Sequence, residues 1–177
     1  FLGFGQKIQA GEYTLNQAMT ISEIAEQLTA GDGRPVVRNI TVIPGWTIED
    51  IANYLVKENV IAGATDFLAR SKTGADYSAY YYVADVINSG TVPQRKYALE
   101  GYLAANTYEI YLTATEDDII KKLLSQTEAL YKEAYHERSQ ELGMTMDQVL
   151  ALASMIEKEA KTADFKRVSS VFHNRLK

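Results

Sequence analysis

The stretch Leu150-Ala151-Leu152-Ala153-Ser154-Met155-Ile156-Glu157-Lys158-Glu159 decides the fold of the second half of this chain, because an apolar run ends there in two carboxylates. Just before it, Thr145 is followed three residues later by Gln148, the pattern of a capping box, so we expect a helix to begin at Met146. Apolar residues then recur at helical spacing and mark the face expected to turn to the core: Val149, Leu152, Ala153, Ile156 and Ala160. The run predicts an amphipathic helix with acids at its C-terminal end.

Glu157 and Glu159 flank that apolar face on opposite sides, because successive residues of an α-helix are about 100° apart. Apolar neighbours would hold such a carboxylate partly out of water and raise its pKa towards the value that a general acid needs. In the alternative interpretation, both acids pair with basic residues at the surface: Lys158, Lys161 or Arg167. Spacing alone does not decide between the catalytic and the surface role.

Composition narrows the classes of protein. The 177 residues are 46% apolar, which is enough for a core in one large or two small domains. A net charge of -5 without a basic stripe argues against nucleic-acid binding. The sequence has no cysteine, and its two histidines, His136 and His173, lie far apart, so we expect no disulfide, no thiolate chemistry and no metal site.

Membrane and targeting signals are not evident in the sequence. No apolar run approaches the roughly 20 residues that a membrane-spanning helix needs, and no signal peptide is recognisable. The chain begins abruptly at Phe1 and stops at Lys177 inside a predicted helix. We therefore expect it to be a fragment of a longer protein.

The first half contains a quasi-repeat over residues 20–28 and 47–55. Each copy opens with a threonine that is followed three residues later by an acid, and then sets apolar residues on one helical face. A strand-like run precedes each copy, over residues 7–15 and 36–43, and a glycine-rich turn at 31–33 follows the first helix. These units predict a small α+β module whose helices lie on one face of a short sheet.

Residues 63–97 look less regular and contain a group of tyrosines: Tyr77, Tyr80, Tyr81 and Tyr82. Clustered tyrosines can stack on sugar rings, or they can pack where two domains meet. Because such a junction suits an irregular segment, we place a domain boundary here, with one domain over residues 1–97 and a second over 98–177.

Helices dominate the second predicted domain. After a strand-like segment at 107–111, Thr115 caps a long amphipathic helix that we expect to end near Gly143. The glutamate-bearing helix comes next, and a last helix carries apolar residues on one side: Val168, Val171, Phe172 and Leu176. Three successive helices with acids at the end of the middle one are typical of a lysozyme-like domain.

Three motifs in this order resemble the YceG-like family of MltG-type endolytic murein transglycosylases: LEGYL at 99–103, ASMIEKE at 153–159 and VSSVFHNRL at 168–176. Upstream, residues 9–13 and 42–52 resemble the LysM-like region that precedes the catalytic domain in that family. The likeness covers essentially the whole chain. It implies an α+β fold, with LysM-like modules followed by part of a mainly helical, lysozyme-like transglycosylase domain.

The resemblance implies cleavage of the β-1,4 bond between N-acetylmuramic acid and N-acetylglucosamine inside a peptidoglycan strand. Such enzymes resemble glycosidases in using a protonated glutamate, but the muramoyl C6 hydroxyl takes the place of water and leaves a 1,6-anhydromuramoyl end. A single glutamate gives and then accepts a proton. Neither a metal nor an organic cofactor is implied.

The family pattern Glu-Lys-Glu-Thr matches Glu157 to Ala160 and so points to Glu159 as the catalytic acid. Ala160 stands where the family has a threonine, which removes a hydroxyl beside the acid. Glu157 is the second candidate, or a carboxylate that supports the acid.

Three further residues are candidates for substrate binding. Glu100 matches an acid characteristic of the family and is expected in or near the cleft, although it could instead cap a helix or a turn. Tyr108 lies in the strand-like segment. Asn174 belongs to the Asn-Arg-Leu motif, where it could orient a carboxylate, bind an acetamido group or satisfy only local backbone. Residues 104–106 depart from the family's aromatic and proline at those positions, which would alter the shape of the cleft.

Two other functions stay open at this stage. One is a non-catalytic glycan-binding module, and the other is an aminodeoxychorismate-lyase-type enzyme using pyridoxal phosphate, for which no lysine stands in a recognisable cofactor setting. If the family function holds, the resemblance implies peptidoglycan strands and their synthases as partners. It also implies that the protein acts at the extracytoplasmic face of a bacterial membrane, where the family is held by an N-terminal anchor that this sequence does not contain. By the same resemblance, we expect the C-terminal part of the catalytic domain to be missing from this sequence.

Overall fold

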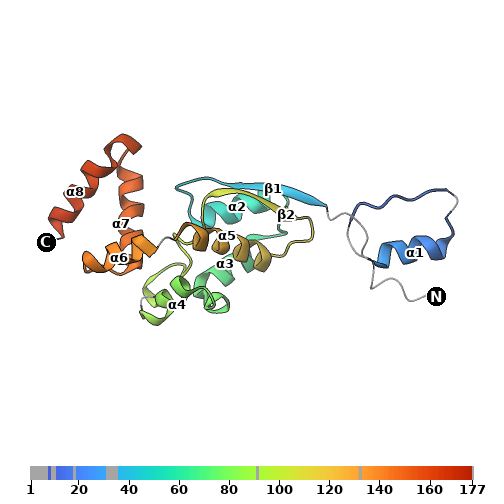
Figure 1. Cartoon of the computed structure of the whole chain (residues 1–177), viewed down its shortest axis with the longest axis horizontal. Helices are drawn as coiled ribbons and strands as arrows, with labels where there is room; N and C mark the ends of the chain where they lie inside the picture. Colours follow the sequence, from blue (N-terminus) through green and yellow to red (C-terminus); the bar gives the residue numbers. More distant parts are fainter. Residues whose placement is uncertain are drawn as a thin grey trace. The chain divides into compact units, whose positions relative to one another are not determined.

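The structure is a computed structural model that describes residues 8, 11–17, 19–30, 36–90, 92–131 and 133–176 (Figure 1). The chain divides into two compact units. The first comprises Phe1–Ile40 with Tyr108–Ala114, and the second comprises Thr41–Thr107 with Thr115–Lys177. The predicted boundary between residues 97 and 98 lies inside the second unit and stays a prediction about domain organisation.

The first unit contains helix α1, Ile21–Ala30. Its start follows the capping pattern read from the sequence: the Thr20 N–H donates to the Glu23 carboxylate at 2.7 Å, and the Glu23 N–H donates to the Thr20 hydroxyl at 3.3 Å. The strand expected over residues 7–15 is wrong for the described part, which has only an isolated bridge at Glu12. Leu15 is exposed there, so no neighbouring layer buries the run. The turn expected at 31–33 lies outside the described residues.

A two-stranded sheet is formed by β1, Val37–Val42, and β2, Asn106–Tyr111. The Leu112 N–H donates to the Val36 carbonyl at 3.0 Å, and the hydroxyls of Thr41 and Thr107 are hydrogen-bonded at 3.0 Å, so the strands run antiparallel. Alternate residues are buried as a one-sided sheet requires: Ile40, Val42, Tyr108 and Ile110. Both strands were predicted from sequence, which confirms the α+β class.

The second unit is mainly helical. Its helices are α2 (Ile48–Lys57), α3 (Ala64–Thr73), α4 (Tyr81–Asn88), α5 (Glu116–Leu130), α6 (Glu133–Glu141), α7 (Met146–Glu159) and α8 (Phe165–Arg175). The core is built mainly from α2, α3, α4 and α5. Its best-buried aliphatic and aromatic side chains include Ile51, Leu55, Phe67, Val86, Ile119, Ile120, Leu123 and Leu124.

The tyrosine-containing segment differs from its prediction. Residues 63–97 are largely helical, with α3 and α4 in place of an irregular stretch. These helices are too short to show a clear helical period in the sequence, but their apolar side chains are buried in one core. Tyr77 and Tyr82 are buried, and their hydroxyls donate to the Asp117 carboxylate at 3.1 Å and to the Leu124 carbonyl at 2.6 Å. These two tyrosines pack α4 and its preceding turn against α5.

The long helix predicted from Thr115 to about Gly143 is two helices. Helix α5 ends at Leu130, where Tyr131 takes an extended backbone with φ of -78° and ψ of 96°. The ring of Tyr131 lies 5.4 Å from that of Tyr82 and 5.8 Å from that of Tyr81, centroid to centroid. These ring contacts, made by residues distant in sequence, accompany a break that the local helical period does not show.

Candidate active site

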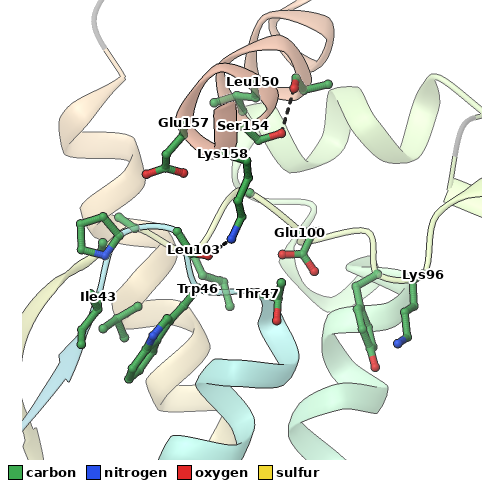
Figure 2. A pocket seen from close by; sticks show the side chains of 18 of the residues that line it. Ile43, Trp46, Thr47, Lys96, Glu100, Leu103, Leu150, Ser154, Glu157 and Lys158 are labelled. Atoms are coloured by element: carbon green, nitrogen blue, oxygen red, sulfur yellow. Dashed lines mark hydrogen bonds between the residues drawn. The ribbon is translucent and has the colours of Figure 1, made fainter. Parts of the chain in front are cut away.

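One pocket, which we call the α7 pocket, has a volume of about 640 Å³ and lies within the second unit (Figure 2). Three segments line it: the turn at residues 42–47, the segment 95–105 and helix α7 between Asp147 and Lys158. A pocket of this size suits a ligand as large as a sugar unit or two. Its charged lining residues are Arg95, Lys96, Glu100, Asp147, Glu157 and Lys158.

The turn at 42–47 leads from β1 into α2. Gly45 has a φ of +81°, a left-handed conformation that favours glycine, and it lets the chain reverse after Pro44. Thr47 then caps α2 and exchanges hydrogen bonds with Asp50, as the sequence predicted. Between them, Trp46 is half-buried and lies on Tyr54, with ring centroids 5.1 Å apart. The turn is therefore anchored on both sides.

Glu100 projects from the segment 95–105 to the start of α2. Its two carboxylate oxygens lie 3.3 and 3.4 Å from the Ile48 nitrogen, whose N–H they accept. The contact satisfies a donor that a helix start leaves without an intrahelical partner. The two sequence-based interpretations of Glu100 are thus compatible, since it lines the pocket and also meets a helix N-terminus.

The electrostatic surroundings of Glu100 favour its protonated form. Burial of the carboxyl raises its pKa, and the nearby charges of Glu49 and Asp50 add to the rise, while the Ile48 N–H and Lys96 oppose it. Lys96 is itself paired with Glu49 at 2.6 Å, and the Tyr97 hydroxyl donates to the same carboxylate at 3.0 Å. Glu100 is therefore a pocket carboxyl that holds its proton more readily than an ordinary glutamate.

Helix α7 begins as predicted, because Thr145 and Gln148 form a capping box at Met146. In the first turn, the Asp147 carboxylate pairs with Arg95 and accepts the Tyr102 hydroxyl at 2.8 Å. Near the other end, the Lys158 ammonium donates to the Gly45 carbonyl at 2.9 Å, as Figure 2 shows. Polar contacts therefore hold both ends of α7, which forms one wall of the pocket.

The two glutamates at the end of α7 are separated by the helix geometry. Glu157 lines the α7 pocket, and Glu159 is not among its lining residues. Residues two positions apart on an α-helix point about 200° apart, so both side chains cannot enter one pocket. Both are exposed, and neither forms an ion pair with the residues that the structure describes. The surface pairing considered from the sequence is absent from the described residues.

The expected apolar shielding of these acids is also wrong for the described residues. Of the predicted core face, Leu152 is buried, whereas Ala153 is exposed and Val149 and Ile156 are only half-buried. The reason is that α7 packs mainly on α6 and α8, neither of which belongs to the central core. Periodicity identified the apolar face but could not say what covers it.

The other predicted substrate-binding residues lie elsewhere. Tyr108 is on β2 and only 4% exposed, and Asn174 is exposed on α8; neither is among the residues that line the α7 pocket. Conversely, sequence reasoning missed Trp46, Arg95 and Asp147 as pocket residues. In the sequence, Asp147 is recognisable only as an acid in the first turn of a predicted helix, and nothing in the sequence marks Arg95 as a pocket residue.

No group of three or more histidine, cysteine, aspartate or glutamate side chains that could hold a metal ion occurs among the described residues. No helix in the described part of the chain is long and apolar enough to span a bilayer. The charged groups that line the α7 pocket are carboxyl, ammonium and guanidinium groups.

The fold and the pocket define an α+β protein whose pocket, lined in part by carboxylates, lies between the start of α2 and the end of α7. The family comparison is more specific: the model of the YceG-like family matches residues 2–177. The chain belongs to the YceG-like family. The family and fold class predicted from sequence motifs are thereby confirmed.

Named relatives agree with this assignment. The chain is similar to the endolytic murein transglycosylase of Bacillus subtilis, at 33% identity over 96% of this chain and 47% of the relative. It is also similar to that of Streptococcus pneumoniae, at 30% identity over 96% of this chain and 33% of the relative. The crystal structure of a YceG-like protein from Listeria monocytogenes matches with a TM-score of 0.67 and 27% identity, over 96% of this chain and 57% of that one. The chain thus spans a third to just over half of the proteins it matches.

Proposed function

We propose that this protein is a lytic transglycosylase that cuts peptidoglycan glycan strands internally, between N-acetylmuramic acid and N-acetylglucosamine. The observation that carries the proposal is similarity over 96% of the chain to two proteins named endolytic murein transglycosylases. A pocket of about 640 Å³ beside the end of α7 supports it, because a cavity of this size accommodates part of a glycan strand.

The proposed reaction needs one carboxyl group and no water. The acid donates its proton to the glycosidic oxygen as the bond from the muramoyl C1 to that oxygen breaks. The C6 hydroxyl of the same muramoyl residue then forms a new bond to C1 and gives its proton to the carboxylate. The acid is regenerated, and the products are a free hydroxyl on one sugar and a 1,6-anhydro end on the other.

We assign the acid to Glu159, because it stands at the second glutamate of the family's Glu-Lys-Glu-Thr pattern. Glu159 is exposed, so a bound glycan strand would supply the exclusion of water that a general acid requires. Glu157 is the competing candidate, since it is the α7 glutamate that shares the pocket with Glu100. Glu100 would then bind the strand or support the acid.

Cleavage of uncross-linked glycan strands by the full-length protein tests both the activity and the assignment. Mass spectrometry should find 1,6-anhydromuramoyl ends with the parent protein. The E159Q variant should lose at least about 100-fold in rate, as removal of a general acid does. E141Q is the matched control, because Glu141 is exposed on α6 and its ion-pair partner among the described residues is Arg138.

The alternatives give different results in the same experiment. Retained cleavage by E159Q with loss in E157Q would move the acid to Glu157. Ends without the anhydro bond would indicate hydrolysis. Binding of strands by every variant, with no cleavage by the parent, would replace the proposal by a glycan-binding module.

We propose further that the protein acts outside the cytoplasmic membrane of a bacterium, held there by an N-terminal helix and close to the peptidoglycan synthases. The support is the substrate, since glycan strands are assembled on that side of the membrane. Fractionation of cells that express the full-length protein should recover it with the membrane, accessible to protease only from outside. Recovery in the cytosol would contradict this part of the proposal.

A further inference from the structure

Each pair of the three segments that build the α7 pocket is joined by a polar contact. The first contact joins the start of α2 to the segment 95–105, where the Ile48 N–H donates to Glu100. The second joins that segment to the first turn of α7 through Asp147. The third returns from the end of α7 to the turn before α2, where Lys158 donates to the Gly45 carbonyl. The contacts form a closed ring around the pocket.

Asp147 makes two polar contacts with the segment 95–105. One carboxylate oxygen pairs with the Arg95 guanidinium, and the other accepts the Tyr102 hydroxyl at 2.8 Å. The side chains of Arg95 and Asp147 are only 22% and 21% exposed, so water screens this pair less than a surface ion pair. A hydrogen bond to a charged acceptor is also stronger than a neutral one.

Tyr102 connects Asp147 to the core of the unit. It is buried, and its ring stacks on that of Tyr82 with centroids 5.7 Å apart and planes inclined by 9°. Tyr82 is in turn bonded to the backbone of α5. The start of α7 is therefore fixed to the best-packed helices, although α7 buries only Leu152 of its own residues.

The length of α7 converts a small movement at its start into a larger one at its end. From Asp147 to the glutamates at the helix end the rise is about 15 to 18 Å, at about 1.5 Å per residue. A tilt of about 4° at the start would displace the end by about 1 Å. A displacement of this size can cost about 100-fold in rate when it misplaces a catalytic group.

We propose that Asp147 is a positioning residue that fixes α7 to Arg95 and Tyr102 and so sets the distance between Glu100 and the glutamates at the end of the helix. Its effect on reaction rate rests on the proposed function, whereas its effect on the position of α7 does not. Asp147 would not touch the reacting atoms. Its contribution would be to the rate of the chemical step rather than to substrate affinity.

The position of α7 can be measured without any activity. The sequence has one tryptophan and no cysteine, so Trp46 in the pocket is a unique fluorescence donor and an introduced cysteine is a unique labelling site. Met155 on α7 is 47% exposed and does not line the pocket, which makes M155C with a dansyl label a suitable acceptor. Time-resolved energy transfer from Trp46 to this label reports the distance between α7 and the turn.

In the full-length protein, carrying this label and with any tryptophan or cysteine outside these 177 residues replaced, we expect D147A to broaden the distribution of transfer efficiencies and to lower its mean. D147N, which keeps an oxygen for Tyr102 but loses the charge facing Arg95, should lie between D147A and the parent, and it serves if D147A folds poorly. D66A is the matched control, because Asp66 pairs with Arg70 on α3 outside the pocket. Equal distributions in D147A, D147N and D66A would overturn the proposal.

Kinetics on glycan strands give the second readout. We expect D147A to lower kcat by 10- to 100-fold with KM within about twofold of the parent, and R95A combined with D147A to be no worse than D147A alone. Additive losses from the two substitutions, or a change confined to KM, would contradict a positioning role. If the parent cleaves no strand while D147A still alters the energy transfer, the proposed function fails and the fixing of α7 by Asp147 stands.

Discussion

At the scale of single residues, Glu100 is a carboxyl group of the α7 pocket whose pKa is raised by its surroundings. Burial raises its pKa, and its position beside Glu49 and Asp50 reinforces this, in spite of the hydrogen bond from Ile48. Ionising such a carboxyl requires more free energy in the folded chain than in the unfolded chain. The surroundings thus shift the titration of Glu100 towards higher pH.

The stability of the protein should therefore respond to pH through Glu100. A carboxyl whose pKa is higher in the folded than in the unfolded chain binds more protons when folded, so its contribution to stability falls as pH rises through the ordinary value of 4.5 towards the raised value. We expect the free energy of unfolding of the parent, relative to E100Q, to decrease from about pH 4 to about pH 7.

Urea unfolding of both proteins at the two pH values, followed by Trp46 fluorescence, measures this difference. E141Q serves as the control, because Glu141 is exposed and lies outside the pocket. A difference between parent and E100Q that is the same at both pH values would show that burial does not perturb Glu100 in solution.

At the scale of elements, the same capping device starts four helices. Thr47, Thr115 and Thr145 exchange hydrogen bonds with the third residue of α2, α5 and α7, and Thr20 does so for α1. The motif supplies acceptors for donors that every helix start leaves open. These helices differ in the number of side chains that they bury. Helix α5 contributes four fully buried aliphatic side chains, whereas α1 contributes no buried side chain.

Removing the cap should therefore cost different amounts in different helices. T115A should lower the free energy of unfolding by about 1 kcal/mol, the usual cost of losing a threonine cap. T20A should leave the global transition nearly unchanged, because fraying of α1 exposes no buried side chain. Urea titrations monitored by circular dichroism compare the two, and equal losses would show that α1 is part of the cooperative core.

At the scale of the whole molecule, burial is concentrated in α2 to α5. Helix α8 has no buried residue, and α6 to α8 with the residues around them carry several large apolar side chains that are exposed: Tyr135, Leu142, Met155, Phe165, Val171 and Leu176. The stability of this chain should come chiefly from the central helices. The end of α7 is consequently held more by polar contacts than by packing.

Core substitutions should reflect this distribution. L123A removes a fully buried side chain of α5 and should lower the free energy of unfolding by about 2 to 5 kcal/mol. V171A, on the exposed side of α8, should change it by less than about 0.5 kcal/mol. Hydrogen exchange should in parallel be slowest for the α5 amides. Comparable losses in the two variants would place part of the stabilising core on α8.

Much of the local structure could be predicted because its causes are local. The capping pairs specified where α1, α2, α5 and α7 begin, and strand-prone runs of residues located both strands. The failures share a different cause. The break at Tyr131 accompanies ring contacts with the distant Tyr81 and Tyr82, and the helices in 63–97 are too short for a period to stand out.

The sequence by itself determined the family, the α+β class and the presence of acids at the end of an amphipathic helix, because motifs, caps and periodicity are properties of neighbouring residues. Only the tertiary structure decided that Glu157 rather than Glu159 shares a pocket with Glu100, and that Asp147 binds Arg95 and Tyr102. These contacts join residues about fifty positions apart. They depend on how whole helices pack, which no local pattern encodes.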